Sequence, residues 1–489
     1  MTSLRYRLLL LPPLLGALAV PGFAPLGAWP LPILSLALLF WWVRGASPRS
    51  AFLAGWGYGL GLFLAGVSWV FVSLSTYGGL PAPVAAIATL LFCAFIALFP
   101  ALALGLAIQL APNGWARPVL ALPAAWVLME WVRGWFLTGF PWLAFGYSQV
   151  PDSPLAGFAP LLGVYGVSLV VALVAGLFAS RRANFMTAGV LLLVAGYGLQ
   201  QVAWTLPVVK PVSVALVQGN VPQEMKFRPE KVIVTLEDYA RQVFSTRARL
   251  VVLPETAVPV FRSGVPQDYL DGLASHVRQQ NGDLLVGLPE DTPSGQYYNA
   301  VASFGSAPEG SYRKHHLVPF GEFVPFGFRW LVDMMHIPLG DFARGAPDQG
   351  PIAAAGEKLA VNVCYEDAFG EERIHAARDA TMLVNVSNDA WFGNSLSPRQ
   401  HLQIGAMRSL EAGRWQLRAN NTGITAILDE KGRVRAELPP FVQATLEGNA
   451  QGMAGLTPYL RWGNGPVLII LAALLALSSL ISRKRAPHE

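Results

Sequence analysis

Eight apolar stretches of near membrane-spanning length dominate this chain, and a long stretch of ordinary globular composition separates the seventh from the eighth. The apolar stretches lie at residues 8–24, 28–43, 52–74, 83–106, 118–136, 160–179, 186–204 and 465–482. Because about 20 apolar residues carry a helix across a bilayer, each stretch is a candidate transmembrane helix. Only 13% of the residues are charged, whereas about 25% is usual in soluble domains. We therefore expect a polytopic α-helical membrane domain together with one water-exposed domain.

The composition changes twice along the chain, and these changes predict the domain boundaries. Residues 1–208 are expected to form a transmembrane domain of seven helices, residues 209–455 a globular domain, and residues 456–489 the last transmembrane helix with a basic tail. The first apolar stretch could be a signal peptide, but further spans follow it directly, so we expect an uncleaved helix.

Basic residues in the short loops predict the orientation in the membrane, because Lys and Arg favour the cytoplasmic side. They flank the spans at Arg5, Arg7, Arg44, Arg49, Arg117, Arg181, Arg182, Arg483, Lys484 and Arg485, and the alternate loops lack them. All of these residues fall on one side if both termini are cytoplasmic. The globular domain, which follows seven spans, is then outside the cytoplasm.

Short apolar runs in the globular segment predict β-strands, and amphipathic patterns between them predict helices. The predicted helices cover residues 229–247, 266–280 and 398–416. Apolar strands interleaved with helices indicate an α/β domain whose sheets are covered by helices. The predicted strands cover residues 212–220, 249–256, 283–291, 297–305, 359–367, 381–389 and 422–429.

Three polar side chains stand at or near the ends of apolar runs, where the functional sites of α/β sheets gather. They are Glu255 in LPET, Lys314 in YRKHHLVPFGE and Cys364 in NVCYE. Cys364 is one of two cysteines in the chain, and the other, Cys93, lies within the fourth apolar stretch. The two cannot form a disulfide within one chain. A thiol that stays free in an extracytoplasmic, usually oxidising space suggests a function.

A thiol, an ammonium and a carboxylate form a complete set for acyl transfer that requires no metal or other cofactor. Cysteine attacks as the thiolate, so its pKa of about 8.5 must be lowered or its proton must be removed. Glu255 is expected to act as the general base for Cys364. Lys314 is expected to favour the thiolate and then to stabilise the negative oxygen that forms when sulfur attacks a carbonyl.

Each of these assignments has an alternative that the sequence leaves open. Glu255 could be a carboxylate of a turn or of a helix start, and Lys314 could be a solvated lysine. Cys364 could instead pair with His315 or His316 as a nucleophile–base dyad.

The motifs VQGN, LPET, LVPFGEFVPF, CYE and SNDAWFG, set between seven spans and one, resemble the apolipoprotein N-acyltransferase family. This family is the membrane-embedded branch of the nitrilase superfamily, and the resemblance covers nearly the whole chain. It implies an αββα sandwich for the globular domain. It also implies a multi-pass enzyme of a bacterial inner membrane with its catalytic domain on the periplasmic side.

The resemblance further implies the substrates and the supporting residues. An acyl chain would leave a membrane phospholipid, typically the sn-1 chain of phosphatidylethanolamine, and pass through a cysteine thioester. The acceptor would be the α-amine of the N-terminal diacylglyceryl-cysteine of an apolipoprotein, in the last step of lipoprotein maturation. No cofactor and no nucleic acid are expected. By the same resemblance, Glu322 is a supporting carboxylate that could orient Lys314, unless it is only structural, and Tyr365 and Glu366 shape the thioester site.

Several other residues suggest a path for lipid. Glu130 and Arg133 lie three apart on one face of the fifth predicted span, where ionisable residues are costly and are often functional. They form either an intrahelical pair or an anchor near a phospholipid head group. The apolar segment 323–342 is either a loop packed within the domain or a membrane-dipping arm that offers Trp330, Met334 and Met335 to lipid.

Two other classes of protein fit parts of the pattern. A membrane-tethered amidase or nitrile hydrolase would use the same three residues on a small substrate. A transporter with an extracytoplasmic binding domain is disfavoured by the few ionisable residues in the first seven spans. A transporter would also not require Glu255, Lys314 and Cys364 together.

Overall fold

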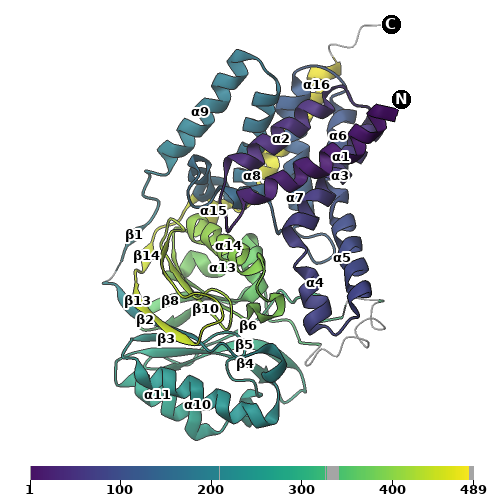
Figure 1. The fold of residues 1–489 in the computed structure, drawn as a ribbon. Helices are drawn as coiled ribbons and strands as arrows, with labels where there is room; N and C mark the ends of the chain where they lie inside the picture. Colours follow the sequence, from purple (N-terminus) through teal and green to yellow (C-terminus); the bar gives the residue numbers. More distant parts are fainter. Residues whose placement is uncertain (1, 209, 325–326, 328–340, 484–489) are drawn as a thin grey trace. The chain divides into compact units, whose positions relative to one another are not determined.

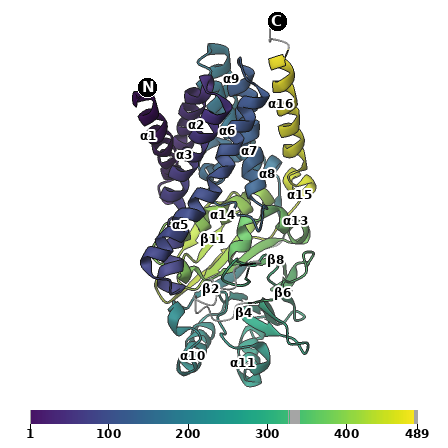
Figure 2. The ribbon, with the colours of Figure 1, turned by 90° about the vertical axis from the view of Figure 1, so that its right-hand side faces the viewer.

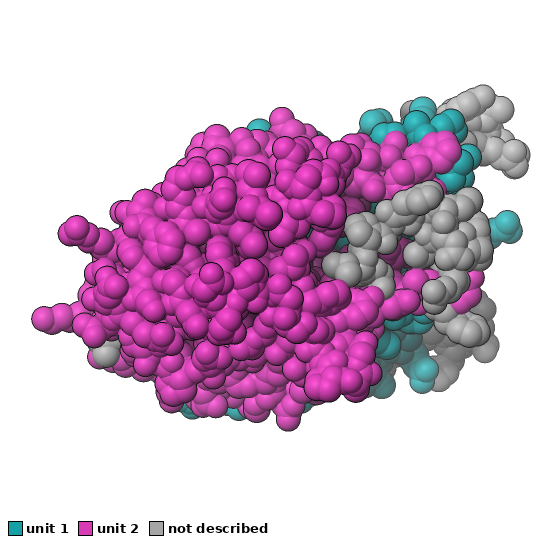
Figure 3. All heavy atoms as spheres, turned by 90° about the horizontal axis from the view of Figure 1, so that it is seen from below, with its two compact units in different colours: residues 1–71, 82–203, 461–489 teal, residues 72–81, 204–460 magenta. Residues whose placement is uncertain are grey.

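The computed structural model describes residues 2–208, 210–324, 327 and 341–483. The chain divides into two compact units, which are coloured separately in Figure 3. The helical unit comprises residues 1–71, 82–203 and 461–489, and the α/β unit comprises residues 72–81 and 204–460. Trp330, Met334 and Met335, which the sequence suggests for lipid access, lie outside the described residues.

A helix lies over each of the eight apolar stretches of the sequence (Figure 1). Among the described residues, four segments are long and apolar enough to cross a membrane, namely Pro48–Val67, Ala82–Leu110, Pro154–Ala179 and Gly465–Arg483. Shorter apolar helices cover Leu10–Gly22, Pro30–Gly45 and Ala183–Leu199. The main helices of this unit are α1 (Thr2–Ala19), α2 (Pro30–Trp42), α3 (Pro48–Val67), α5 (Ala82–Ile96), α6 (Leu98–Leu110), α7 (Leu122–Arg133), α8 (Ala159–Ala179), α9 (Ala183–Leu199) and α16 (Gly465–Arg483).

Small residues allow α1 and α3 to pack with their backbones in close contact. A Cβ atom added at Gly61 of α3 would lie 1.9 Å from the carbonyl oxygen of Pro13 in α1. One added at Gly16 of α1 would lie 2.0 Å from the carbonyl oxygen of Tyr58 in α3. Lipid tails are as apolar as the helix surfaces, so helices in a bilayer associate through such close packing rather than through the hydrophobic effect.

Two six-stranded sheets form the centre of the α/β unit. Their strand orders are β13-β2-β3-β4-β5-β6 and β12-β11-β10-β9-β8-β7. Strands β2, β3 and β4 run parallel to one another, as do β8, β9 and β10. The strands are β2 (Val212–Gln218), β3 (Leu250–Val252), β4 (Asp283–Asp291), β5 (Tyr297–Gly305), β6 (Ser311–Arg313), β7 (Ile352–Ala354), β8 (Glu357–Val363), β9 (Met382–Ser387), β10 (Trp415–Asn420), β11 (Ala426–Leu428), β12 (Val434–Glu437) and β13 (Ala444–Ala450), with a separate short pair, β1 (Leu206–Pro207) and β14 (Met453–Ala454).

The two sheets pack against each other, and helices cover their outer faces (Figure 1 and Figure 2). Val212, Val214 and Leu216 of β2 point into the core between the sheets, whereas Ala215 and Val217 point towards the helices. This alternation is the two-residue period of a strand, and burial of both faces explains the apolar runs in the sequence. The layering is the expected αββα sandwich. The covering helices are α10 (Pro229–Ser245) and α11 (Gln267–Arg278) on one sheet and α13 (Gly370–Asp379) and α14 (Ser397–Ala412) on the other.

Residues 72–81 belong to the α/β unit although they continue from the third predicted span. Helix α3 ends at Val67, the short α4 covers Val70–Val72, and a π-helical turn follows at Ser73–Tyr77. The Tyr77 ring lies edge-on to that of Trp391, with centroids 6.1 Å apart. The regular helix therefore ends earlier than the apolar stretch in the sequence suggests.

Candidate active site

Cys364 directly follows β8 and begins a short 3-10 helix, Cys364–Ala368. Its backbone φ is +53°, a left-handed conformation that costs a non-glycine residue about 1–2 kcal/mol. Such conformations persist where the surrounding structure enforces them, and they cluster at active sites. Asn388 and Asp389 follow the parallel neighbour β9. The two strands therefore present reactive and polar side chains at the same edge of the sheet.

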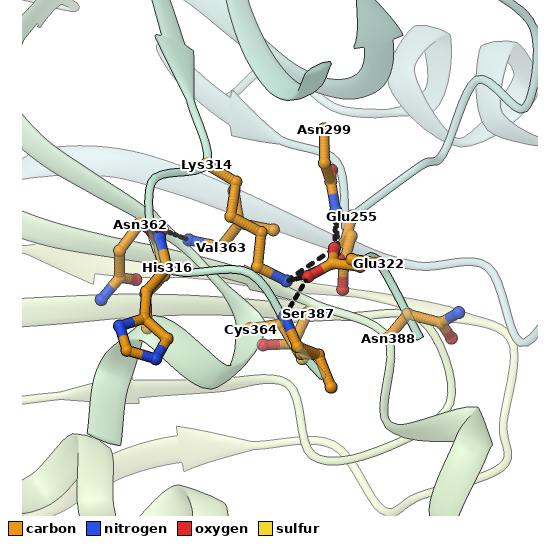
Figure 4. A network of polar contacts seen from close by, with 12 residues as sticks. Glu255, Asn299, Lys314, His316, Glu322, Asn362, Val363, Cys364, Ser387 and Asn388 are labelled. Atoms are coloured by element: carbon orange, nitrogen blue, oxygen red, sulfur yellow. Dashed lines mark hydrogen bonds and ion pairs between the residues drawn. The ribbon is translucent and has the colours of Figure 1, made fainter. Parts of the chain in front are cut away.

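Lys314 lies between two carboxylates (Figure 4). Its Nζ is 2.8 Å from Glu322 Oε2, 2.9 Å from Glu322 Oε1 and 3.6 Å from Glu255 Oε1. The lysine side chain is only 1% exposed, which excludes the alternative of a solvated lysine. A buried ammonium persists only where opposite charges and hydrogen-bond acceptors surround it. The structure therefore brings Glu255, Lys314 and Glu322 into one cluster.

Neighbouring donors hold the two carboxylates of this cluster in place. Asn299 Nδ2 donates to Glu255 Oε1 at 2.7 Å and to Glu322 Oε1 at 2.8 Å. The backbone N–H of Val318 donates to Glu322 Oε2 at 2.8 Å. Lys226, also buried, donates from Nζ to the backbone carbonyl oxygen of Glu255 at 2.9 Å. These contacts hold the carboxylates of Glu255 and Glu322 and also the backbone at Glu255 in place.

The buried side chain of Glu366 ties the lysine segment to the cysteine strand. Its Oε1 accepts three hydrogen bonds from the segment that carries Lys314, and its Oε2 accepts one from the N–H that precedes Cys364. One carboxylate therefore sets the position of the ammonium relative to the thiol. The donors are the Tyr312 hydroxyl at 2.8 Å and the backbone N–H groups of His315 at 2.8 Å, His316 at 3.1 Å and Val363 at 2.8 Å.

The two histidines that follow Lys314 direct their rings to other partners. His315 Nδ1 lies 2.8 Å from the carbonyl oxygen of Gly345, and His316 Nδ1 lies 3.0 Å from Glu372 Oε1. These contacts disfavour a cysteine–histidine dyad, in which a ring nitrogen must face the sulfur. The ring of Tyr365 packs edge-on against that of His316, with centroids 5.9 Å apart, and a role of Tyr365 in shaping the thioester site stays a prediction.

Burial and the neighbouring carboxylates keep the thiol protonated. Burial and the Glu255 carboxylate hold the pKa of Cys364 well above its ordinary value, although the Lys314 ammonium acts in the opposite direction. Burial also raises the pKa of Glu255, which Lys314 opposes and Glu322 reinforces. Burial alone would lower the pKa of Lys314, but Glu322 and Glu255 outweigh it and raise that pKa. The sequence leaves two ways to obtain the reactive thiolate, a lowered thiol pKa or removal of the proton by a base. The raised pKa of Cys364 fits removal of the proton by a base better than a preformed thiolate.

Glu130 and Arg133 are buried in the helical unit and hold a loop of the same unit. Glu130 accepts two hydrogen bonds through Oε1, and Arg133 donates to two backbone carbonyls. These contacts hold the backbone of the loop, and both the intrahelical pair and the role near a phospholipid head group stay predictions. The partners are Trp126 Nε1 at 3.0 Å and the Phe145 N–H at 3.1 Å for Glu130, and the carbonyl oxygens of Trp142 at 2.7 Å and of Phe140 for Arg133.

The sequence analysis missed three buried residues that contact the candidate active site in the α/β unit, namely Lys226, Asn299 and His401. Asn299 is a polar residue within an apolar strand run, a signal that could have drawn attention to it. Lys226 lies in a loop after the VQGN motif, and His401 lies at the start of a helix, and no periodicity singles out either of them.

The family model described as carbon-nitrogen hydrolase matches residues 213–459, which make up most of the α/β unit. The model described as apolipoprotein N-acyltransferase N-terminal domain matches residues 15–177. An apolipoprotein N-acyltransferase of Nitrosomonas europaea is 50% identical over 477 residues, which cover 95% of this chain and 96% of that protein. One of Ralstonia nicotianae is 47% identical over 489 residues, covering 97% and 93%.

The chain therefore belongs to the apolipoprotein N-acyltransferase family, which confirms the resemblance seen in its motifs. It is an acyltransferase of lipoprotein biosynthesis built on a nitrilase-superfamily domain. Among solved structures, Saccharomyces cerevisiae Nit3, a member of branch 10 of the nitrilase superfamily, is 18% identical, covers 49% of this chain and 90% of its own, and has a TM-score of 0.38.

We expect Lys314→Met to slow the alkylation of Cys364 at every pH at which the thiolate is the minor form. Removal of the ammonium takes away the charge that lowers the thiol pKa, so this pKa should rise further. The rate of reaction with iodoacetamide would be measured against pH in a Cys93→Ala background. Lys358→Met, at an exposed lysine of the same unit, should leave the rate unchanged. An unaltered thiol pKa in Lys314→Met would mean that the ammonium acts only on the oxyanion.

We expect Glu366→Gln to lower the free energy of unfolding by about 1–3 kcal/mol, because one buried N–H then loses its acceptor. The amide can accept at only one end, whereas the carboxylate accepts at both. Thermal unfolding in detergent would be compared with that of Glu371→Gln, a change at an exposed carboxylate nearby. Equal melting temperatures for the two variants would contradict the tying role of Glu366.

Proposed function

We propose that the chain transfers an acyl chain from a membrane phospholipid, through a thioester on Cys364, to the α-amine of the N-terminal diacylglyceryl-cysteine of an apolipoprotein. The observation that carries this proposal is the buried cluster of Glu255, Lys314 and Glu322 beside Cys364, in a chain of this family. A thiol, a base and a fixed cation suffice to move an acyl group from an ester to an amine. Phosphatidylethanolamine is the donor that the family resemblance favours.

In the first half-reaction, Cys364 Sγ attacks the ester carbonyl of the donor while Glu255 takes the thiol proton. The oxyanion that forms is stabilised by the Lys314 ammonium, which is already fixed and so needs no reorganisation. The bond between the acyl carbon and the glycerol oxygen then breaks. Glu255 returns the proton to the departing alkoxide, and a lysophospholipid leaves the acyl thioester behind.

In the second half-reaction, the neutral α-amine of the acceptor attacks the thioester carbonyl. Glu255 takes a proton from the attacking nitrogen and passes it to the sulfur as the carbon–sulfur bond breaks. The products are the amide and the restored Cys364 thiol. Asn299, which bonds both carboxylates, keeps Glu255 in reach throughout.

We place the eight apolar stretches across a bacterial inner membrane, with both termini in the cytoplasm and the α/β unit on the periplasmic side. Support comes from the Lys and Arg residues confined to alternate loops, and from the helices of the helical unit that are long and apolar enough to span. A bilayer donor and a lipid-bearing acceptor also require a catalytic unit that is tied to the membrane.

A membrane-tethered amidase or nitrile hydrolase would use the same cluster on a small substrate. The match of residues 15–177 to the N-terminal domain of this acyltransferase family favours lipid substrates instead. A transporter has no use for a buried base, cation and thiol.

Cys364→Ala and Cys364→Ser should leave the protein folded and inserted but abolish transfer, because the α/β unit has no other cysteine. Transfer of a labelled acyl chain to a diacylated lipopeptide would be measured in mixed micelles, beside the melting temperature. Cys93→Ala is the matched control and should keep full activity. Substantial turnover by Cys364→Ala would remove the covalent mechanism.

Without an acceptor, the purified enzyme should release one equivalent of lysophospholipid and retain the acyl chain on Cys364. The reason is that the first half-reaction needs only the donor, as ping-pong kinetics require. Lysophospholipid release and the mass of the intact protein would be measured together. Continuous release of fatty acid would identify a hydrolase, and release that begins only when acceptor is added would contradict the thioester intermediate.

A further inference from the structure

The backbone carbonyl of Cys364 is held by two side-chain donors from other elements. His401 Nε2 lies 3.1 Å from this oxygen, and Asn385 Nδ2 lies 3.2 Å from it. His401 is 2% exposed and sits near the start of α14, and its other ring nitrogen, Nδ1, lies 3.0 Å from Asp389 Oδ1. The ends of β8 and β9 and the N-terminal part of α14 thus meet at the peptide that follows the cysteine.

The groups on the two sides of the His401 ring set its orientation. A carbonyl oxygen can only accept, so Nε2 carries a hydrogen and donates it to Cys364. Burial would raise the pKa of Asp389, but His401 and Arg418 outweigh burial and hold that pKa below its ordinary value. The other ring nitrogen, Nδ1, faces the Asp389 carboxylate, and this contact helps to fix the orientation of the ring. Asn420 Nδ2 fixes the other carboxylate oxygen at 2.6 Å.

The left-handed conformation of Cys364 requires stabilising contacts such as those of His401 and Asn385 with its carbonyl oxygen. At a φ of +53° the residue would gain by returning to a negative φ, and that rotation would take its carbonyl away from His401 and Asn385. Asn385 is itself fixed, because its Nδ2 also donates to Asn362 Oδ1 at 2.8 Å. Because a peptide is planar and trans, the same contacts also set the direction of the N–H that follows Cys364.

We propose that His401, which Asp389 orients, is a positioning residue for acyl transfer. It holds Cys364 in the left-handed conformation and thereby directs Sγ towards the substrate carbonyl. This inference rests on the proposed function, in which Cys364 is the nucleophile. His401 acts through the backbone and need not touch either substrate. A misplacement of a reacting atom by about 1 Å can cost about 10²-fold in rate, which sets the size of the expected effect.

The test compares His401→Ala, His401→Gln and Asp389→Asn in phospholipid-to-lipopeptide transfer. His401→Ala should lower kcat by about 10²-fold with an unchanged KM for the donor, and should slow lysophospholipid release in the first half-reaction by the same factor. His401→Gln, whose amide can donate to the Cys364 carbonyl, should recover about tenfold of this loss. The double variant His401→Ala with Asp389→Asn should be no slower than His401→Ala, because Asp389 acts through His401.

His276→Gln is the matched control. His276 Nε2 lies 2.9 Å from the carbonyl oxygen of Thr246, so this change disturbs the same kind of contact on α11, and it should leave kcat unchanged. General damage to the fold would instead lower the melting temperature of His401→Ala together with its kcat.

Three results would overturn the proposal: a kcat of folded His401→Ala close to that of the wild type, a loss confined to KM, or equal loss in His401→Gln and His401→Ala. If His401→Ala does not fold, Asp389→Asn decides. A reduced kcat with an unchanged melting temperature supports the proposal, and an unchanged kcat overturns it. Failure of the proposed function would look different, because the wild-type protein would then release no lysophospholipid from the donor.

Discussion

The buried ammonium of Lys314 is the interaction on which the rest of the site depends. A charge with 1% exposure needs counter-charges, and the structure supplies Glu322 at 2.8 Å and Glu255 at 3.6 Å. Removing one partner of a buried pair costs about 3–5 kcal/mol, because the other charge is left uncompensated. The end of β3, the segment after β6 and the turn that carries Glu322 therefore cannot shift independently. The rigidity of the candidate active site follows from this requirement.

The two carboxylates that follow Cys364, those of Glu366 and Asp367, stabilise the backbone next to the thiol through hydrogen bonds. Glu366 and Asp367 are at most 1% exposed, and hydrogen-bond donors surround both of them. Asp367 accepts from Asn362 Nδ2 at 2.6 Å and pairs with the buried guanidinium of Arg418. Their charges are thus satisfied within the α/β unit. The end of β8 carries a reactive side chain above a polar network that fixes the backbone below it.

Much of the α/β unit could be predicted because strands that are buried on both faces are apolar along their whole length. Strand β10 is not an apolar run, and the predicted helix 398–416 took in its first residues, although α14 ends at Ala412. The alternate polar residues of β10 are buried in the network around Asp367 and Asp389. Helix α13 was missed because most of its residues are polar, and β6 and β7 are only three residues long. Cys364 could be found from the end of an apolar run. Lys226 and His401 could not, since their partners lie 29 and 37 residues away and only the fold joins them. The polar residues of β10 are Gln416, Arg418 and Asn420.

A thiol that stays protonated is also oxidised slowly. Oxidants and disulfides react with the thiolate, and oxidation of cysteine beyond the sulfenic acid is largely irreversible. Burial and the Glu255 carboxylate keep Cys364 in the thiol form. The environment that makes the proposed nucleophile depend on a base therefore protects it between turnovers, and on the periplasmic side proposed for the α/β unit it would do so without a dedicated reductant.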